Sequence, residues 1–143
     1  MAYTLKADGA NSFTLGEETL QTLKFTNTSA DNSNARARDT YQTLTVTGRI
    51  RSASDGDVSD DTVKAVKWAL VPAANQTAYQ KITATAVAAG QTTRNYEFSQ
   101  GFVVNYKETF TDQSGVGSFS LEVRQKKDQL DQVKVSGGYS ADS

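Results

Sequence analysis

The chain has 143 residues, a formal net charge of -1 and 37% hydrophobic residues, a composition typical of one folded domain rather than a disordered chain. It contains no Cys and no His, which excludes disulfides, thiolate nucleophiles, Cys-ligated metal centres and the commonest neutral-pH acid–base group. We therefore expect a single domain over residues 1–143, with no enzymatic activity and no cofactor.

The sequence gives no sign of a membrane segment. No apolar run approaches the roughly 20 residues that a helix needs to span a bilayer, so we expect no membrane insertion. The first residues lack the basic and apolar regions of a secretory signal, and we expect synthesis in the cytoplasm. The near-neutral charge argues against tight binding to nucleic-acid phosphates.

The first third of the chain predicts short strands followed by a long loop. Residues 3–7, 13–15 and 20–26 contain Thr, Tyr and Phe, which are common in strands. Residues 27–39 are polar, small and aperiodic, which indicates a loop between two strands. Loops of this length in a small domain are usually functional or disordered.

Two segments show the clearest strand periodicity. Residues 41–50 and 118–125 place apolar side chains such as Leu44, Val46 and Leu121 at every second position, with polar side chains between them. Each segment therefore predicts a strand with one buried and one polar face. The polar positions are Thr43, Thr45, Thr47 and Arg49 in the first segment, and Ser118, Ser120, Glu122 and Arg124 in the second.

A short helix is predicted between these strands, over residues 60–71. Ser59 or Asp60 can cap its first turn, and Pro72 ends it because proline cannot donate the next hydrogen bond. An apolar stripe at helical spacing is expected to pack on the sheet. The stripe consists of Val63, Val66 and Leu70, with Trp68 on a neighbouring flank.

Residues 79–88 predict another strand, and residues 92–110 predict an unusually long one. Apolar side chains keep to even positions over this second stretch, which would run to roughly 60 Å at about 3.3 Å per residue. A strand of that length has to bend or split, and Gly101 is the expected position. The chain then predicts a hairpin connection over residues 114–117 and a frayed tail near residues 137–143.

Few residues suggest chemistry. Asp55, Asp57, Asp60 and Asp61 fit either a calcium site or a solvated turn with a helix cap, and the spacing favours the cap because no Glu closes a calcium loop. A hydrolase that used only carboxylates would need two acidic residues at a cleft, and no pair stands out. The resulting fold class is mainly β, a small antiparallel barrel or sandwich with one short helix. Its exposed strand edges point to assembly as the function class.

The order of these elements resembles the tube-protein family: the haemolysin-coregulated protein (Hcp) of type VI secretion and the tail-tube proteins of contractile phages and related injection particles. The resemblance is carried by residues 34–48, by the single helix, and by residues 98–106 followed by 119–123. It implies a small β-barrel flanked by a helix, and hexameric rings that stack into a hollow tube. Such a tube lies inside a contractile sheath, is built from a baseplate or spike, and passes cargo DNA or protein.

The resemblance also implies roles for two groups of residues. Residues in the long loop would contact adjacent subunits, and the joined inner sheets would line the lumen. The expected interface residues are Asn34, Arg36, Arg38 and Asp39, although a solvated loop would explain Arg36 and Arg38 equally simply. The expected lumen residues are Thr43, Thr45, Thr47, Arg49, Ser120, Glu122 and Arg124.

A rival hypothesis is a monomeric module, either a carbohydrate-binding β-sandwich or a capsid-decoration protein. A sugar-binding module predicts an exposed aromatic platform, because sugars stack on aromatic rings. A tube subunit instead predicts polar strand faces and free strand edges.

Overall fold

A computed structural model describes residues 1–28, 41–50, 61–72, 74–111, 117–125 and 134–137. These residues form an antiparallel eight-stranded sheet with one short α-helix, as expected from the sequence. The elements are β1 (Ala2–Asp8), β2 (Phe13–Leu15), β3 (Leu20–Thr28), β4 (Tyr41–Ile50), α2 (Asp61–Ala69), the 3-10 turn η1 (Gln76–Ala78), β5 (Gln80–Ala88), β6 (Gln91–Phe110), β7 (Gly117–Gln125) and β8 (Lys134–Gly137).

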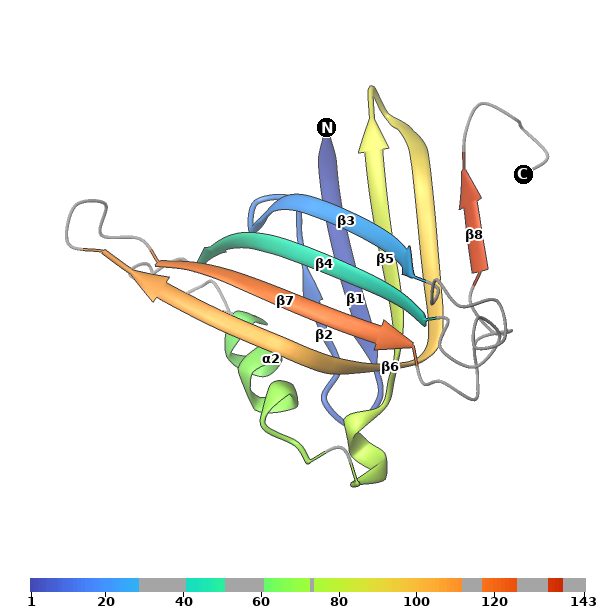
Figure 1. Cartoon of the computed structure of the whole chain (residues 1–143). Coiled ribbons are helices and arrows are strands. Elements are labelled where there is room, and N and C mark those ends of the chain that lie inside the picture. Colours follow the sequence, from blue (N-terminus) through green and yellow to red (C-terminus); the bar gives the residue numbers. More distant parts are fainter. Residues whose placement is uncertain (29–40, 51–60, 73, 112–116, 126–133, 138–143) are drawn as a thin grey trace.

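The sheet folds over on itself into two layers. Its strand order is β2-β1-β5-β6-β7-β4-β3, with β8 added to β6. The back layer contains β2, β1, β5, β8 and residues 91–101 of β6, and the front layer contains β3, β4, β7 and residues 102–110 of β6. The strands of the two layers cross steeply, and α2 lies at one end between them (Figure 1). The buried apolar side chains of both layers form one core.

The two layers are joined by the bend in β6 at Gly101, as predicted. Gly101 is the residue at which β6 changes partner, because it is paired both with Gln80 of β5 and with Gln125 of β7. A Cβ atom at this position would lie 2.7 Å from Ile82 Cγ1 and 2.9 Å from Val123 Cγ1. The corner is therefore packed too closely for a side chain.

The expectation of one continuous apolar face along β6 is wrong at Phe102. The pairing shifts register on both sides of Gly101, because β6 contains one extra residue between Phe98 and Gly101 and another between Val103 and Asn105. Each bulge reverses which positions face the core. Val103 consequently packs against the core, whereas Phe102 shares a face with Arg124 and meets Tyr79 edge-on at 5.8 Å.

The predicted apolar stripe of the helix is also wrong. Val63 and Leu70 are 48% and 76% exposed, and the face that packs on the sheets consists of Thr62, Ala65 and Trp68. Trp68 is 1% exposed, its indole N–H donates to the carbonyl of Ala78 at 2.8 Å, and its ring lies 5.8 Å from Phe13. The indole buries more apolar area than Val or Leu and finds a partner for its N–H, so it determines the rotation of the helix.

Several predicted boundaries change. The third strand extends to Thr28, two residues into the expected loop, and β8 includes Gly137, the first residue of the expected tail. The rest of the long loop, the proposed helix caps Ser59 and Asp60, the connection at 114–116 and the end of the tail lie outside the described residues. The strands predicted over 41–50 and 118–125 are confirmed, with Leu44, Val46 and Leu121 fully buried.

Candidate assembly surfaces

The front layer has a polar outer surface, here called the polar face, which includes all seven expected lumen residues. The register pairs Thr43 with Arg124, Thr45 with Glu122, and Thr47 with Ser120, and Arg49 follows two residues after Thr47. Paired residues of an antiparallel sheet share a face, so the structure brings the two sets together. Thr43 is buried and Arg49 is exposed, while the other five residues are partly buried.

The neighbouring strands extend this face and add two cations that are not among the expected lumen residues. Lys24 of β3 is paired with Thr45, and Lys107 of β6 is paired with Ser120. Lys24 could have been recognised from its alternation with Leu23 and Phe25 in the third strand. Lys107 could not, because the bulges in β6 reset which positions face outward.

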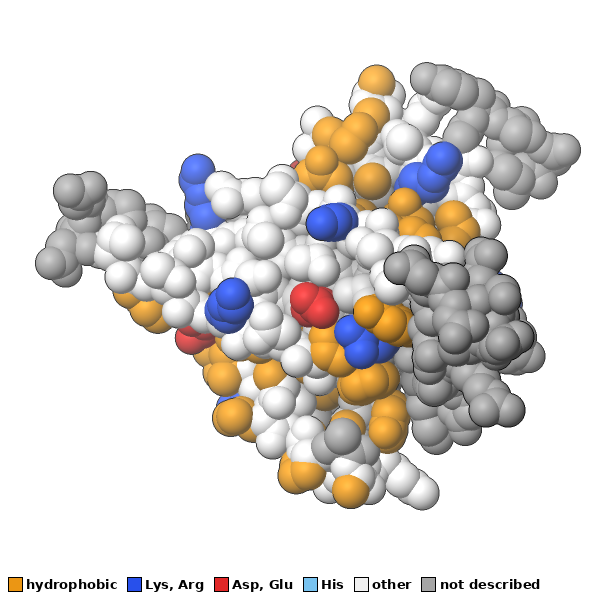
Figure 2. Space-filling model, viewed as in Figure 1, with side chains coloured by type: hydrophobic (Ala, Val, Ile, Leu, Met, Phe, Trp, Pro, Cys, Tyr) orange, Lys and Arg blue, Asp and Glu red, His pale blue; other side chains and the backbone are white. Residues whose placement is uncertain are grey.

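The charge of the polar face is uneven. Its described residues include the cations Lys24, Arg49, Lys107 and Arg124 but only one carboxylate, Glu122, for a net charge of +3. No ion pair joins any of these five residues to another residue of the described segments. The space-filling view shows scattered Lys and Arg side chains on a mostly uncharged polar surface (Figure 2).

The outer surface of the back layer balances its charges locally. Lys6 lies 4.0 Å from Asp8, and Lys81 lies 3.9 Å from Glu97. Lys134 of β8, which is paired with Glu97, adds one further cation. The two layers therefore present differently charged surfaces to their surroundings.

Two strand edges of the front layer are unpaired within the described part of the chain. β3 pairs with β4 along one edge, and no described strand pairs with its other edge. β6 is flanked by β5 only as far as Gly101, so the edge of residues 102–110 that faces away from β7 is also open. Open edges expose unpaired backbone N–H and C=O groups to pairing with another chain.

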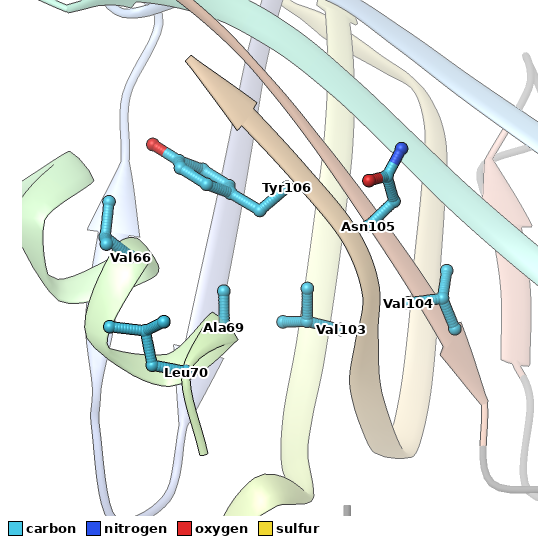
Figure 3. A pocket seen from close by; sticks show the side chains of 7 residues that line it. All are labelled: Val66, Ala69, Leu70, Val103, Val104, Asn105 and Tyr106. Carbon is cyan, nitrogen blue, oxygen red and sulfur yellow. The ribbon is translucent and has the colours of Figure 1, made fainter. Parts of the chain in front are cut away.

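An apolar groove lies beside the open edge of β6. Val66, Ala69 and Leu70 at the end of α2 lie opposite Val103 and Tyr106 of β6 across a space of about 280 Å³, which Val104 and the polar Asn105 also line (Figure 3). Leu70 and Phe110 are 76% and 66% exposed, so apolar surface borders the same open edge. The space-filling view shows apolar side chains gathered on this side, below the polar face (Figure 2).

The remaining expected sites lie mostly outside the described residues. Asn34, Arg36, Arg38 and Asp39 lie outside the described residues, so their interface role stays a prediction. Asp55, Asp57 and Asp60 lie outside them too, and the described residues contain no group of His, Cys, Asp and Glu side chains that could hold a metal ion. None of the described helices is long and apolar enough to cross a membrane.

The chain has the fold of solved tube and Hcp structures. Hcp1 from Flavobacterium johnsoniae matches with a TM-score of 0.58 and 14% identity, over 96% of this chain and 97% of that one. A chain of the anti-feeding prophage baseplate, solved as a 6-fold symmetrised particle, matches with a TM-score of 0.53 and 10% identity, over 95% and 93% of the two chains.

A third match comes from the sheath–tube complex of an extracellular contractile injection system in its extended state. Its TM-score is 0.52 at 8% identity, over 96% of this chain and 89% of that one. No protein-family model and no curated protein matches the sequence. The likeness is thus one of fold, and it agrees with the resemblance found in the order of the sequence elements.

Proposed function

We propose that this protein is the structural subunit of the inner tube of a contractile phage tail, a phage-like particle or a type VI-like injection system, and that it has no catalytic role. Copies would close into rings, and the rings would stack into a hollow conduit. The observation that carries the proposal is the pair of open edges on opposite sides of one four-stranded layer. The matches to Hcp1 and to a sheath–tube complex support it through the fold.

The strand directions fit ring closure. β3, β4, β7 and β6 are antiparallel in succession, so β3 and β6 run in opposite directions. In a rotationally symmetric ring, β3 of one copy would therefore meet β6 of the next as a further antiparallel pair. A head-to-tail contact of this kind, repeated around a closed ring, leaves no open edge in the front layer.

Ring closure also gives the apolar groove a partner. The groove and the exposed side chains of Leu70 and Phe110 lie beside the edge that would receive the neighbouring β3. The neighbour would cover this apolar surface while it pairs with the strand. Backbone hydrogen bonds and apolar burial would thus act at the same contact.

The polar face would line the lumen of such a ring. With six copies, the symmetry of the anti-feeding prophage particle, the joined front layers would form a barrel of about 45 Å between opposite backbones, from the usual strand spacing and tilt. The back layer would face outward, toward a sheath. The proposed lumen residues are Thr43, Thr45, Thr47, Arg49, Ser120, Glu122 and Arg124, and the loop residues Asn34, Arg36, Arg38 and Asp39 are proposed contacts between subunits.

The rival sugar-binding hypothesis receives less support. It requires an aromatic platform, and Phe110 is the one exposed aromatic side chain of the described segments. Other rings stack on one another in pairs, for example Phe25 on Tyr96 at 4.6 Å. No specific observation favours a carbohydrate or capsid-decoration role.

The test is assembly of the purified protein and of two variants with the same substitution on the same helical segment. Leu70→Glu places a charge in the groove, whereas Val63→Glu places it on exposed helix surface away from the groove. We expect uniform rings or tubes from the wild type and from Val63→Glu in negative-stain electron microscopy. For Leu70→Glu we expect the concentration needed for assembly to rise about tenfold or more, because apolar burial is replaced by a desolvated charge.

Both variants should still unfold cooperatively, with a free energy of unfolding within about 0.5 kcal/mol of the wild-type value, since both positions are exposed. Light scattering gives the mass of the particles over the same concentration series. A wild-type protein that stays monomeric under all concentrations and salts would overturn the proposal. Equal assembly of Leu70→Glu and Val63→Glu would instead remove the groove from the interface.

A further inference from the structure

We infer that the lumen selects cargo by charge and that its cargo is acidic protein, an inference that rests on the proposed tube function. The described residues of the polar face have a net charge of +3 per copy, and no ion pair joins any of its charged side chains to another residue of the described segments. The cations are contributed by all four strands: Lys24 by β3, Arg49 by β4, Arg124 by β7 and Lys107 by β6. They are therefore spread over the whole face and not gathered at one point.

Ring closure would multiply this charge. Every copy would contribute the same surplus to one enclosed surface, where low-dielectric walls strengthen the field. The surplus belongs to this layer and not to the chain as a whole, whose net charge is -1. The outer surface of the back layer pairs Lys6 with Asp8 and Lys81 with Glu97 and has a surplus of one cation, Lys134, so the larger surplus lies where cargo would pass.

The surroundings of the cations favour protein over nucleic acid. Single-stranded nucleic acid is held by aromatic rings on which bases stack. On the polar face, Phe102 contacts Tyr79 edge-on, and the guanidinium of Arg124 lies 4.1 Å from the centre of the Tyr41 ring. Phe102 and Tyr41 are thus already engaged and do not offer an open stacking surface for bases. Duplex DNA presents one phosphate charge about every 1.7 Å of its axis, and a cationic wall would hold it along its whole length and oppose its passage.

An acidic protein would meet the same wall differently. Its carboxylates are separated on its surface, and each exposed charge contact contributes at most about 1 kcal/mol. The hydroxyl groups between the cations, among them Thr45, Thr47 and Ser120, offer weak hydrogen bonds that do not demand a particular sequence. Several weak contacts together would retain cargo in the tube and still release it.

Cargo and assembly should then be coupled. A ring of unneutralised cations repels itself, and an acidic polypeptide inside it would remove part of that repulsion. A ligand that binds the ring but not the free subunit shifts the equilibrium toward the ring. An acidic polypeptide should therefore lower the protein concentration at which rings form, whereas a basic polypeptide should not.

The experiment uses fluorescent poly-L-glutamate as the probe, with poly-L-lysine, single-stranded DNA and duplex DNA as comparisons. Assembled tubes are sedimented with each probe, and the retained fraction is measured at about 0.1 M and about 1 M NaCl, between which the screening length falls from about 10 Å to about 3 Å. Two double variants remove the same charge from the chain: Lys24→Gln with Lys107→Gln on the polar face, and Lys6→Gln with Lys81→Gln on the back layer. Electron microscopy records separately whether each protein forms tubes.

We expect wild-type tubes to retain poly-L-glutamate at low salt and to release it at high salt. The retained fraction should fall about tenfold in the polar-face variant and stay unchanged in the back-layer variant, because several weak contacts act together. Tubes that form but retain no poly-L-glutamate, or lose it equally in both variants, would overturn the inference and leave the tube function intact. Tubes that retain either DNA more strongly than poly-L-glutamate would reassign the cargo class. Absence of tubes would overturn the proposed function. Titration of poly-L-glutamate against the two double variants as monomers would then decide whether the polar face binds acidic chains.

Discussion

The two layers of this molecule are built from the same strand-forming residues around one core, yet their edges differ. The back layer ends on short strands, β2 of three residues and β8 of four, whereas the front layer ends on the nine-residue β3 and on residues 102–110 of β6. In the back layer β2 covers residues 5–7 of β1, and β8 covers residues 94–97 of β6 on the edge opposite β5. The charges of its outer surface form the ion pairs Lys6–Asp8 and Lys81–Glu97. In the front layer the edges of β3 and of residues 102–110 of β6 are open, and the described outer surface contains four cations but one carboxylate. The back layer resembles the surface of an ordinary monomer, and the front layer resembles a sheet that a neighbouring copy completes.

The comparison shows where to look for function in a β-protein when no catalytic site stands out among its described residues. A polar sheet face is ordinary, since one face of an antiparallel sheet commonly meets solvent. Open edges are not ordinary, because proteins usually protect them with short strands, bulges or covering segments. The long open edges of the front layer, beside exposed apolar side chains, are therefore the surface on which the proposed assembly would act.

The largest expected effect comes from the residue that anchors α2 to the sheets. Trp68→Ala should lower the free energy of unfolding by about 3–5 kcal/mol, because it leaves a large cavity next to Phe13 and an unpartnered carbonyl at Ala78. Urea denaturation followed by circular dichroism measures the loss. Val63→Ala on the exposed side of the helix should change it by less than about 0.5 kcal/mol, and a comparable loss there would refute the observed rotation of the helix.

The second prediction concerns the joint between the layers. Gly101→Ala should cost about 1–3 kcal/mol of unfolding free energy, since its methyl group would press on Ile82 and Val123 in the core. Gly16→Ala is the matched control, because a Cβ atom there would meet nothing within 4 Å. If both variants unfold at the same urea concentration, the close packing of the corner is not what holds the layers together.

The third prediction concerns amide hydrogen exchange at the open edges, compared between monomers and rings. Backbone amides of β3 and of residues 102–110 that point to the open edges should exchange about tenfold or more slowly in rings than in monomers, because they gain partners there. Amides of β1, already paired with β5 over the whole strand, should change little. Equal protection of both layers on assembly would contradict pairing through the front layer.

The smallest effect is expected from single charges. Lys81→Gln removes one surface ion pair and should change stability by less than about 1 kcal/mol, with no effect on ring formation. Lys24→Gln lowers the surplus charge of the front layer and should let rings form at a modestly lower concentration in low salt. Light scattering over a salt series measures ring formation by both variants, and urea denaturation measures their stability. The difference in ring formation should disappear at high salt, where the repulsion is screened.

Local patterns predicted the strands whose side chains alternate strictly. The buried positions of residues 41–50 and 118–125, including Val46 and Val123, follow from a period of two that holds whatever the partner strand is. Gly101 was predicted as the bend because a strand of that length cannot stay straight in a small domain and glycine is the one residue in its middle without a Cβ atom. Such features depend on neighbours in the chain, and so the sequence contains them.

Other features depended on which segments meet. The apolar stripe of Val63, Val66 and Leu70 suggested the wrong face of α2, because periodicity alone cannot show that Trp68 finds a hydrogen-bond acceptor at Ala78. The position of Phe102 was wrong because bulges reverse the facing of a strand, and a bulge is defined only against its partner. β8 was missed because its residues become a strand only through pairing with residues 94–97.

The candidate assembly surfaces divide in the same way. The polar composition of Thr43, Thr45, Thr47, Arg49, Ser120, Glu122 and Arg124 could be derived from the sequence, since alternation is a property of each strand alone. Strand order and register decide three other properties. They bring these residues onto one face with Lys24 and Lys107, they give that face its surplus of positive charge, and they leave two edges open. These are long-range properties, settled by how the segments pack when the core forms, and no local period encodes them.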